Sequence, residues 1–159
     1  MKLWAFPLIL VACATAAAPQ PRIVAAAGRW AALAGQGQCD AASLSLLPAS
    51  KTRLQGRVSL TFDRRTRNGQ FAAALSKQVA PGSSVLLTID EDQYLLVARG
   101  FGAWSRGPAQ EAAILAALRR ASRMRIEGRS VRGLRFIDRY GLAGAPTAID
   151  AAAACAAKL

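Results

Sequence analysis

Two stretches of the chain alternate apolar and polar residues with a period of two. They cover residues 57–62 and 123–127. Successive residues of a strand point to opposite faces of a sheet, so this pattern predicts two half-buried strands. The residues expected to face the interior are Val58, Leu60, Phe62, Met124 and Ile126.

Further strands are expected where short runs of β-branched or bulky residues are bounded by turn residues. Residues 85–89 and 94–98 read as a hairpin around an acidic turn at residues 90–92. The three acids have no EF-hand spacing, so we interpret them as a solvated turn and not as a calcium site. Residues 29–33 and 134–140 add a first and a last strand, for about six or seven strands in all.

Two helices are expected, over residues 108–121 and 147–158. Pro108 suits the first helical position, where its missing N–H costs nothing. Thr147 stands three residues before Asp150, as in a capping box, and an alanine-rich run follows. No βαβ alternation is evident, so the predicted fold is mainly β: an antiparallel β-sandwich or rolled sheet with two flanking helices.

The first eighteen residues have the three-part form of a secretory signal peptide. Lys2 precedes an apolar run over residues 3–12, and small residues follow. The run is too short for a membrane span, which needs roughly 20 residues. One alternative is a buried N-terminal element; another is a lipobox over residues 10–13, which would make Cys13 a lipidated N-terminus.

The resulting domain organisation has three parts. Residues 1–18 are the expected signal peptide, residues 19–28 a flexible lead-in, and residues 29–159 a single domain. The expected location is the periplasm or cell envelope, as a free or a lipid-anchored protein.

Export leaves two cysteines, Cys39 and Cys155, which are most simply a disulfide in an oxidising compartment. Two buried free thiols are the alternative. A metal site is not expected, because two thiolates without histidine fall short of the four ligands that zinc prefers.

The charge balance is strongly basic: 21 Lys and Arg stand against 9 Asp and Glu, a formal net charge of +12. The chain has no histidine, which removes the commonest general base and every Ser-His-Asp or Cys-His arrangement. No phosphate-binding or nucleotide-binding loop motif occurs either. We therefore expect neither an enzyme nor a cofactor.

Basic residues concentrate on the last two predicted strands and the turn between them. If their side chains share a face, they form an anion-binding patch suited to phosphates or carboxylates; the alternative is a solvated face in a chain rich in Arg and Ala. The candidate residues are Arg123, Arg125, Arg129, Arg132, Arg135 and Arg139.

The expected partners of this patch are anionic envelope components or an unknown protein. A cytoplasmic nucleic-acid-binding protein is the alternative if the N-terminal segment is retained, because the net charge would suit it.

Several short motifs occur along the chain in a defined order. Residues 85–90 are followed by Tyr94, by Ala103-Trp104 and, after the first helix, by residues 127–133. Residues 138–142 and a helix ending at Cys155 come next, while Trp30, Cys39 and residues 57–60 precede the series. Together these motifs resemble the invasion-associated locus B family of exported bacterial proteins, and the last three resemble the opening of that family.

The resemblance implies an envelope location and a mostly β fold with a disulfide. Residues 134–137 and Gly141 depart from the family pattern, in which a Thr- or Ser-rich segment precedes the Tyr and a Ser precedes the Leu. Virulence is not carried over as a function.

Overall fold

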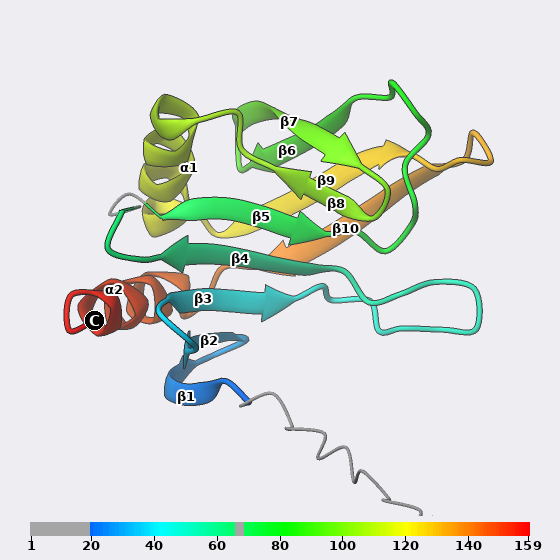
Figure 1. Ribbon diagram of the computed structural model, residues 1–159. Coiled ribbons are helices and arrows are strands. Elements are labelled where there is room, and N and C mark those ends of the chain that lie inside the picture. The colour runs from blue at the N-terminus through cyan, green and yellow to red at the C-terminus, as the bar shows by residue number, and fades with distance from the viewer. Residues whose placement is uncertain (1–19, 66–68) are drawn as a thin grey trace, which may run out of the picture.

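The computed structural model describes residues 20–65 and 69–159. Within these residues, ten strands form one antiparallel sheet, against which two helices pack (Figure 1). The predicted fold class is therefore confirmed. In chain order the elements are β1 (Arg22–Ala27), β2 (Trp30–Ala34), β3 (Cys39–Leu44), β4 (Arg57–Phe62), β5 (Gln70–Ala74), β6 (Val85–Ile89), β7 (Asp92–Arg99), β8 (Gly102–Trp104), α1 (Pro108–Arg120), β9 (Arg123–Arg129), β10 (Arg135–Gly141) and α2 (Ala145–Ala156).

The sheet is open but strongly curled. Its strand order is β1-β2-β3-β4-β5-β8-β7-β6-β9-β10, so β1 and β10 are its two edges. The curl brings β10 back to the connection between β3 and β4, where the amide of Leu46 donates to the carbonyl of Arg139 at 2.7 Å. Figure 1 shows this connection and the β9–β10 turn at the end of the molecule opposite the two helices.

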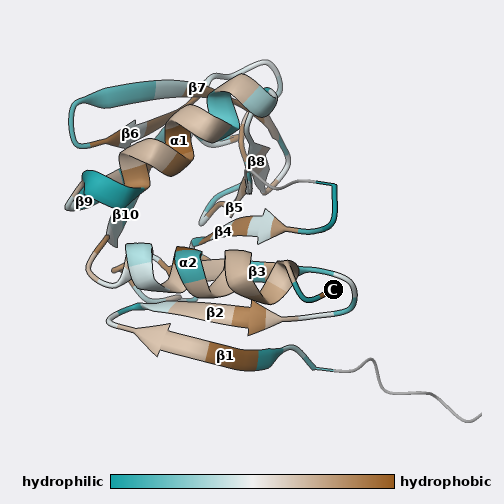
Figure 2. Ribbon diagram, turned by 90° about the vertical axis from the view of Figure 1, so that its left-hand side faces the viewer, coloured by the Kyte–Doolittle hydropathy of each residue, from teal (hydrophilic) through white to brown (hydrophobic). Residues whose placement is uncertain are grey.

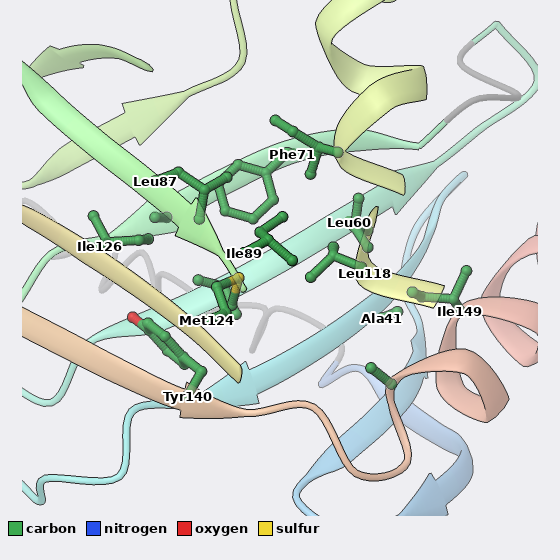
Figure 3. Packing of buried hydrophobic residues seen from close by; sticks show 14 of the residues in the cluster. Ala41, Leu60, Phe71, Leu87, Ile89, Leu118, Met124, Ile126, Tyr140 and Ile149 are labelled. Carbon is green, nitrogen blue, oxygen red and sulfur yellow. The ribbon is translucent and has the colours of Figure 1, made fainter. Parts of the chain in front are cut away.

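The interior lies between the concave face of the sheet and the helices. The five apolar residues that alternation placed inside, in β4 and β9, are all buried. Ile114 and Leu118 of α1 and Ile149 of α2 are also fully buried. Figure 3 shows Leu118 beside Leu60 of β4. Burying each such side chain stabilises the fold by about 1.5–3 kcal/mol, so the helices are held mainly by their apolar faces.

The predicted disulfide is present and joins β3 to α2. The sulfur atoms of Cys39 and Cys155 are 2.00 Å apart, and their Cα atoms are 6.0 Å apart. Ala152 and Ala156 are buried on the same helix, and these small side chains let α2 lie close to the sheet. In Figure 2, α2 runs alongside β1, β2 and β3. Neither helix of the described chain has the length and apolar character that a membrane crossing requires.

Two boundaries differ from the sequence predictions, and the two elements concerned meet at one contact. Residues 22–27 of the expected lead-in are an edge strand, β1, which pairs with β2. Helix α2 begins at Ala145 and not at residue 147, and it has no side-chain cap. Its N-cap is Gly144, with φ of 90°, where a Cβ atom would lie 2.0 Å from the carbonyl oxygen of Ala27. Only glycine fits this approach between helix and strand.

The expected signal peptide over residues 1–18 and the candidate lipidation at Cys13 lie outside the described residues.

Candidate anion-binding groove

Five of the six predicted arginines share one face of the sheet. The register places Arg129 opposite Arg135 and Arg125 opposite Arg139, on the neighbouring strands β9 and β10. Arg123 lies two residues before Arg125 and therefore on the same face. Their side chains are exposed on the convex side, and the sixth, Arg132, lies in the turn that joins the two strands.

Acidic side chains reduce the charge of this face. Arg135 Nη2 lies 2.9 Å from Oε2 of Glu127, and Arg125 Nε lies 3.6 Å from the same oxygen. Arg123 Nε lies 3.9 Å from Oδ1 of Asp90. A hollow of about 390 Å³ over this part of the face is lined by Arg123, Arg125 and Arg139, but also by Asp90 and Glu91.

The acidic turn between β6 and β7 has a structural role as well as exposure to solvent. Both carboxylate oxygens of Asp90 accept hydrogen bonds, from the amides of Ser122 and Arg123 at 3.1 Å. Asp92 forms an ion pair with Arg120 at 2.6 Å. These contacts connect the acidic turn to the end of α1 and the start of β9.

A concavity whose charged lining residues are all basic lies at the opposite end of β9 and β10. It is a groove of about 650 Å³ between the β3–β4 connection and the β9–β10 turn, and residues 76–78 and Phe101 also line it. We call it the basic groove. Its lining residues are Ser50, Lys51, Thr52, Arg53, Leu54, Ser76, Lys77, Gln78, Phe101, Ser130, Val131, Arg132, Leu134, Arg135 and Phe136.

The wall formed by the β3–β4 connection is held by side-chain bonds to its own backbone. Arg53 Nη2 donates to the carbonyl of Pro48 at 2.6 Å, and Lys77 Nζ donates to the carbonyl of Thr52. The amide of Leu54 donates to the carbonyl of Ser76 at 3.2 Å. Arg53 and Lys77, two basic side chains of the groove, thus also hold the β3–β4 connection in place.

The opposite wall is joined to the floor of the groove by backbone bonds. Val131 donates to the carbonyl of Gln78 at 3.0 Å, and Val79 forms an isolated bridge with Ser130. The amide of Val79 also donates to the carbonyl of Gly100 at 2.8 Å, next to Phe101. Four segments that are distant in the sequence are therefore fixed around one concavity.

The lining combines basic, hydroxyl and apolar side chains, and no acidic side chain is among the residues that line it. The basic side chains are Lys51, Arg53, Lys77, Arg132 and Arg135. The hydroxyl-bearing side chains are Ser50, Thr52 and Ser130, whereas the hydroxyl of Ser76 is buried. Guanidinium, ammonium and hydroxyl groups all donate hydrogen bonds to phosphate or carboxylate oxygens. Of the basic groups, Arg135 also pairs with Glu127 outside the groove.

Exposed apolar side chains lie among these charges. Leu134 is 67% exposed, Leu54 is 56% exposed, and Val131 is 52% exposed. Phe101 is 46% exposed at the neighbouring turn. A ligand that meets this lining would gain from carrying both an anionic group and an apolar group.

A buried polar cluster lies directly beneath the floor of the groove. Asp138 is fully buried, and its Oδ2 accepts a hydrogen bond from the amide of Ser76 at 2.9 Å. Oδ1 of Asp138, Oγ of Ser76 and the hydroxyl of Tyr140 have no protein hydrogen-bond partner among the described residues. Burial, and then the nearby charge of Asp138, raise the pKa of the Tyr140 phenol well above its ordinary value.

Two residues of the basic groove, Arg132 and Arg135, belong to the arginine patch predicted from the sequence, whereas Lys51, Arg53 and Lys77 do not. No local pattern marks these three residues, because their common feature is the curl that brings β10 beside the β3–β4 connection. The part of the chain that the structure describes contains no group of three or more Cys, Asp or Glu side chains placed to hold a metal ion.

Scans of protein-family models, of curated proteins and of solved structures each return no match to this chain.

Proposed function

We propose that this chain is an exported, non-enzymatic binding protein of the bacterial envelope, and that the basic groove takes an anionic envelope component. The observation that carries the proposal is the composition of the groove, where five basic side chains and no acidic side chain line about 650 Å³. The convex face of β9 and β10 is a weaker candidate, because Glu127 and Asp90 neutralise part of its charge.

Export is supported by the disulfide between Cys39 and Cys155, which persists in oxidising compartments and is rare in the cytosol. The order of residues 1–18 supports it independently. We further propose that the chain is a member of the invasion-associated locus B family. A mostly β fold with a disulfide agrees with that resemblance, and the proposal assigns no catalytic step to any residue.

A phosphate amphiphile tests the groove directly. We expect the purified, oxidised protein to bind monomeric dodecyl phosphate more tightly than the uncharged dodecyl maltoside, as measured by calorimetry. The variant Lys51→Gln/Arg132→Gln removes two exposed charges of the groove and should weaken binding about tenfold or more, because each charge-assisted hydrogen bond contributes on the order of 1 kcal/mol.

A second variant separates the groove from the net charge. Arg29→Gln/Lys158→Gln removes the same two charges from exposed positions in the β1–β2 turn and after α2, away from the groove lining. It should bind dodecyl phosphate within about twofold of the unaltered protein. Equal weakening by both variants would mean that the basic surface acts only through its total charge, and the groove would lose its role.

Fractionation with intact-mass analysis tests the exported location. We expect a periplasmic or envelope protein shortened at its N-terminus, with a mass lowered by two hydrogens for the disulfide. A lipidated Cys13 would appear as an added acyl mass, whereas a full-length chain in the cytoplasm would favour the nucleic-acid-binding alternative.

A further inference from the structure

Exposed apolar side chains gather on three loops at one end of the molecule. Leu47 and Leu54 belong to the β3–β4 connection, Phe101 to the β7–β8 turn, and Val131 and Leu134 to the β9–β10 turn. Each is between 46% and 67% exposed. The three loops lie at the end of the molecule opposite the helices (Figure 1). Apolar side chains collected in this way on a soluble surface mark an interaction site.

Three of the five basic side chains of the groove belong to the same loops. Lys51 and Arg53 stand between Leu47 and Leu54 in the chain, and Arg132 stands between Val131 and Leu134. Because no acidic residue lines the groove, the surface of these loops complements a layer of negative charge. Apolar side chains interspersed with Lys and Arg are typical of segments that bind the interface of an anionic bilayer.

The geometry points to an anionic lipid bilayer as the partner of this end of the molecule. This inference rests on the proposed function and specifies it: the basic groove binds the phosphate of a lipid headgroup while the apolar residues of the three loops enter the interfacial region. Charge complementarity favours the bilayer, because it offers phosphates over the whole width spanned by the three loops. It also offers acyl chains beneath the phosphates, where Leu134 and Leu54 would be buried.

Vesicle co-sedimentation tests the inference, with the Cys13→Ser substitution in every protein so that no lipid anchor contributes. We expect binding to vesicles of phosphatidylglycerol and phosphatidylcholine and little binding to phosphatidylcholine alone. Lys51→Gln/Arg132→Gln should reduce the binding constant about 10- to 30-fold, since each basic residue at the surface contributes a several-fold factor.

A pair of apolar variants distinguishes insertion from attraction by charge. Leu134→Ser should weaken vesicle binding by about fivefold or more, because the leucine no longer gains from burial in the interface. Ile23→Ser is the matched control: Ile23 is 64% exposed, on the edge strand β1, and its loss should leave vesicle binding unchanged. Leu134→Trp should show fluorescence quenched by lipids brominated on their acyl chains, and Ile23→Trp should not.

The outcomes separate this inference from the proposed function. Binding of dodecyl phosphate without binding of anionic vesicles overturns the bilayer and leaves the groove as a site for a smaller anion. Vesicle binding that Leu134→Ser and Ile23→Ser affect equally, with no quenching at residue 134, also overturns it. Absence of binding to both probes overturns the proposed function as well.

Discussion

Asp138 is fully buried in β10, beneath the basic groove. The amide of Ser76 donates a hydrogen bond to its Oδ2 at 2.9 Å. A buried carboxylate is costly unless it is hydrogen-bonded, so the surrounding backbone must stay close. The backbone at Gly56 can approach Asp138 because glycine has no Cβ atom. A Cβ atom at this position would lie 2.8 Å from the Tyr140 hydroxyl oxygen and 2.9 Å from Cγ of Asp138.

The substitution Gly56→Ala should therefore destabilise the protein. The added methyl would force Tyr140 and Asp138 to move in a packed interior, at a cost of about 1–3 kcal/mol. Urea unfolding measures this difference. Gly141→Ala is the control, since a Cβ atom there meets nothing within 4 Å and the change should stay within about 0.5 kcal/mol. If both substitutions have the same effect, the close approach at Gly56 is not what makes glycine necessary.

The two tyrosines of the chain should ionise in different pH ranges. Burial raises the pKa of Tyr140, and the charge of Asp138 raises it further; burial also raises the pKa of Tyr94. An unfolded chain releases a tyrosine proton at about pH 10, whereas the folded chain keeps the proton of Tyr140. The contribution of this retained proton to the free energy of unfolding is therefore fully present below about pH 10, and it is lost as the pH rises above that value.

Absorbance of tyrosinate, followed together with circular dichroism, checks this prediction. Tyr94 should ionise first, in the folded protein, and Tyr140 only together with unfolding. Tyr140→Phe should make the loss of stability at high pH less steep. Ionisation of both tyrosines before any unfolding would show that the Tyr140 phenol is accessible to solvent.

Among the elements, those with regular alternation were predictable and those built from small residues were not. Strands β4 and β9 carry large apolar side chains at every second position, which gives a clear signal. Strands β1, β3 and β8 were missed, because alanine and glycine have low strand propensity and their pairing is decided by neighbouring strands. The start of α2 was placed too late, because the contact between Gly144 and Ala27 is invisible in the local sequence.

The disulfide connects strand β3 to helix α2. It joins residues 116 positions apart, so in the loop-entropy model its removal should cost on the order of 4–5 kcal/mol. The variant Cys39→Ser/Cys155→Ser should show this loss in urea unfolding, and reduction of the unaltered protein should give a similar loss. Unchanged stability in both measurements would mean that the packing of α2 on β1 to β4 is sufficient without the bond.

At the scale of the whole molecule, the candidate site depends on the curl of the sheet more than on any motif. The sequence shows a run of arginines in β9 and β10, and the register of the two strands places five of them on one face. The structure also shows that this face contains carboxylates, while the groove around the β9–β10 turn does not. Lys51 and Lys77 belong to the groove through tertiary contacts, which spacing along the chain cannot reveal.

The excess of positive charge should make the stability of the whole molecule depend on salt. The formal net charge is +12, so positive side chains repel one another in the compact state. The described ion pairs involve largely exposed arginines. Raising sodium chloride from about 0.01 M to about 0.15 M shortens the screening length from about 30 Å to about 8 Å. We therefore expect the midpoint of thermal unfolding to rise with salt; a midpoint that falls would contradict the repulsion.

Inorganic phosphate at constant ionic strength separates binding from this general screening. An anion that binds the folded groove raises the midpoint further, because binding to the native state alone stabilises it by mass action. The added rise should disappear in Lys51→Gln/Arg132→Gln and persist in Arg29→Gln/Lys158→Gln. A solvent effect of phosphate would persist in both variants, since it does not depend on where the charges lie. The comparison thus shows whether the charge acts as a diffuse field or through the four segments that the curled sheet brings together.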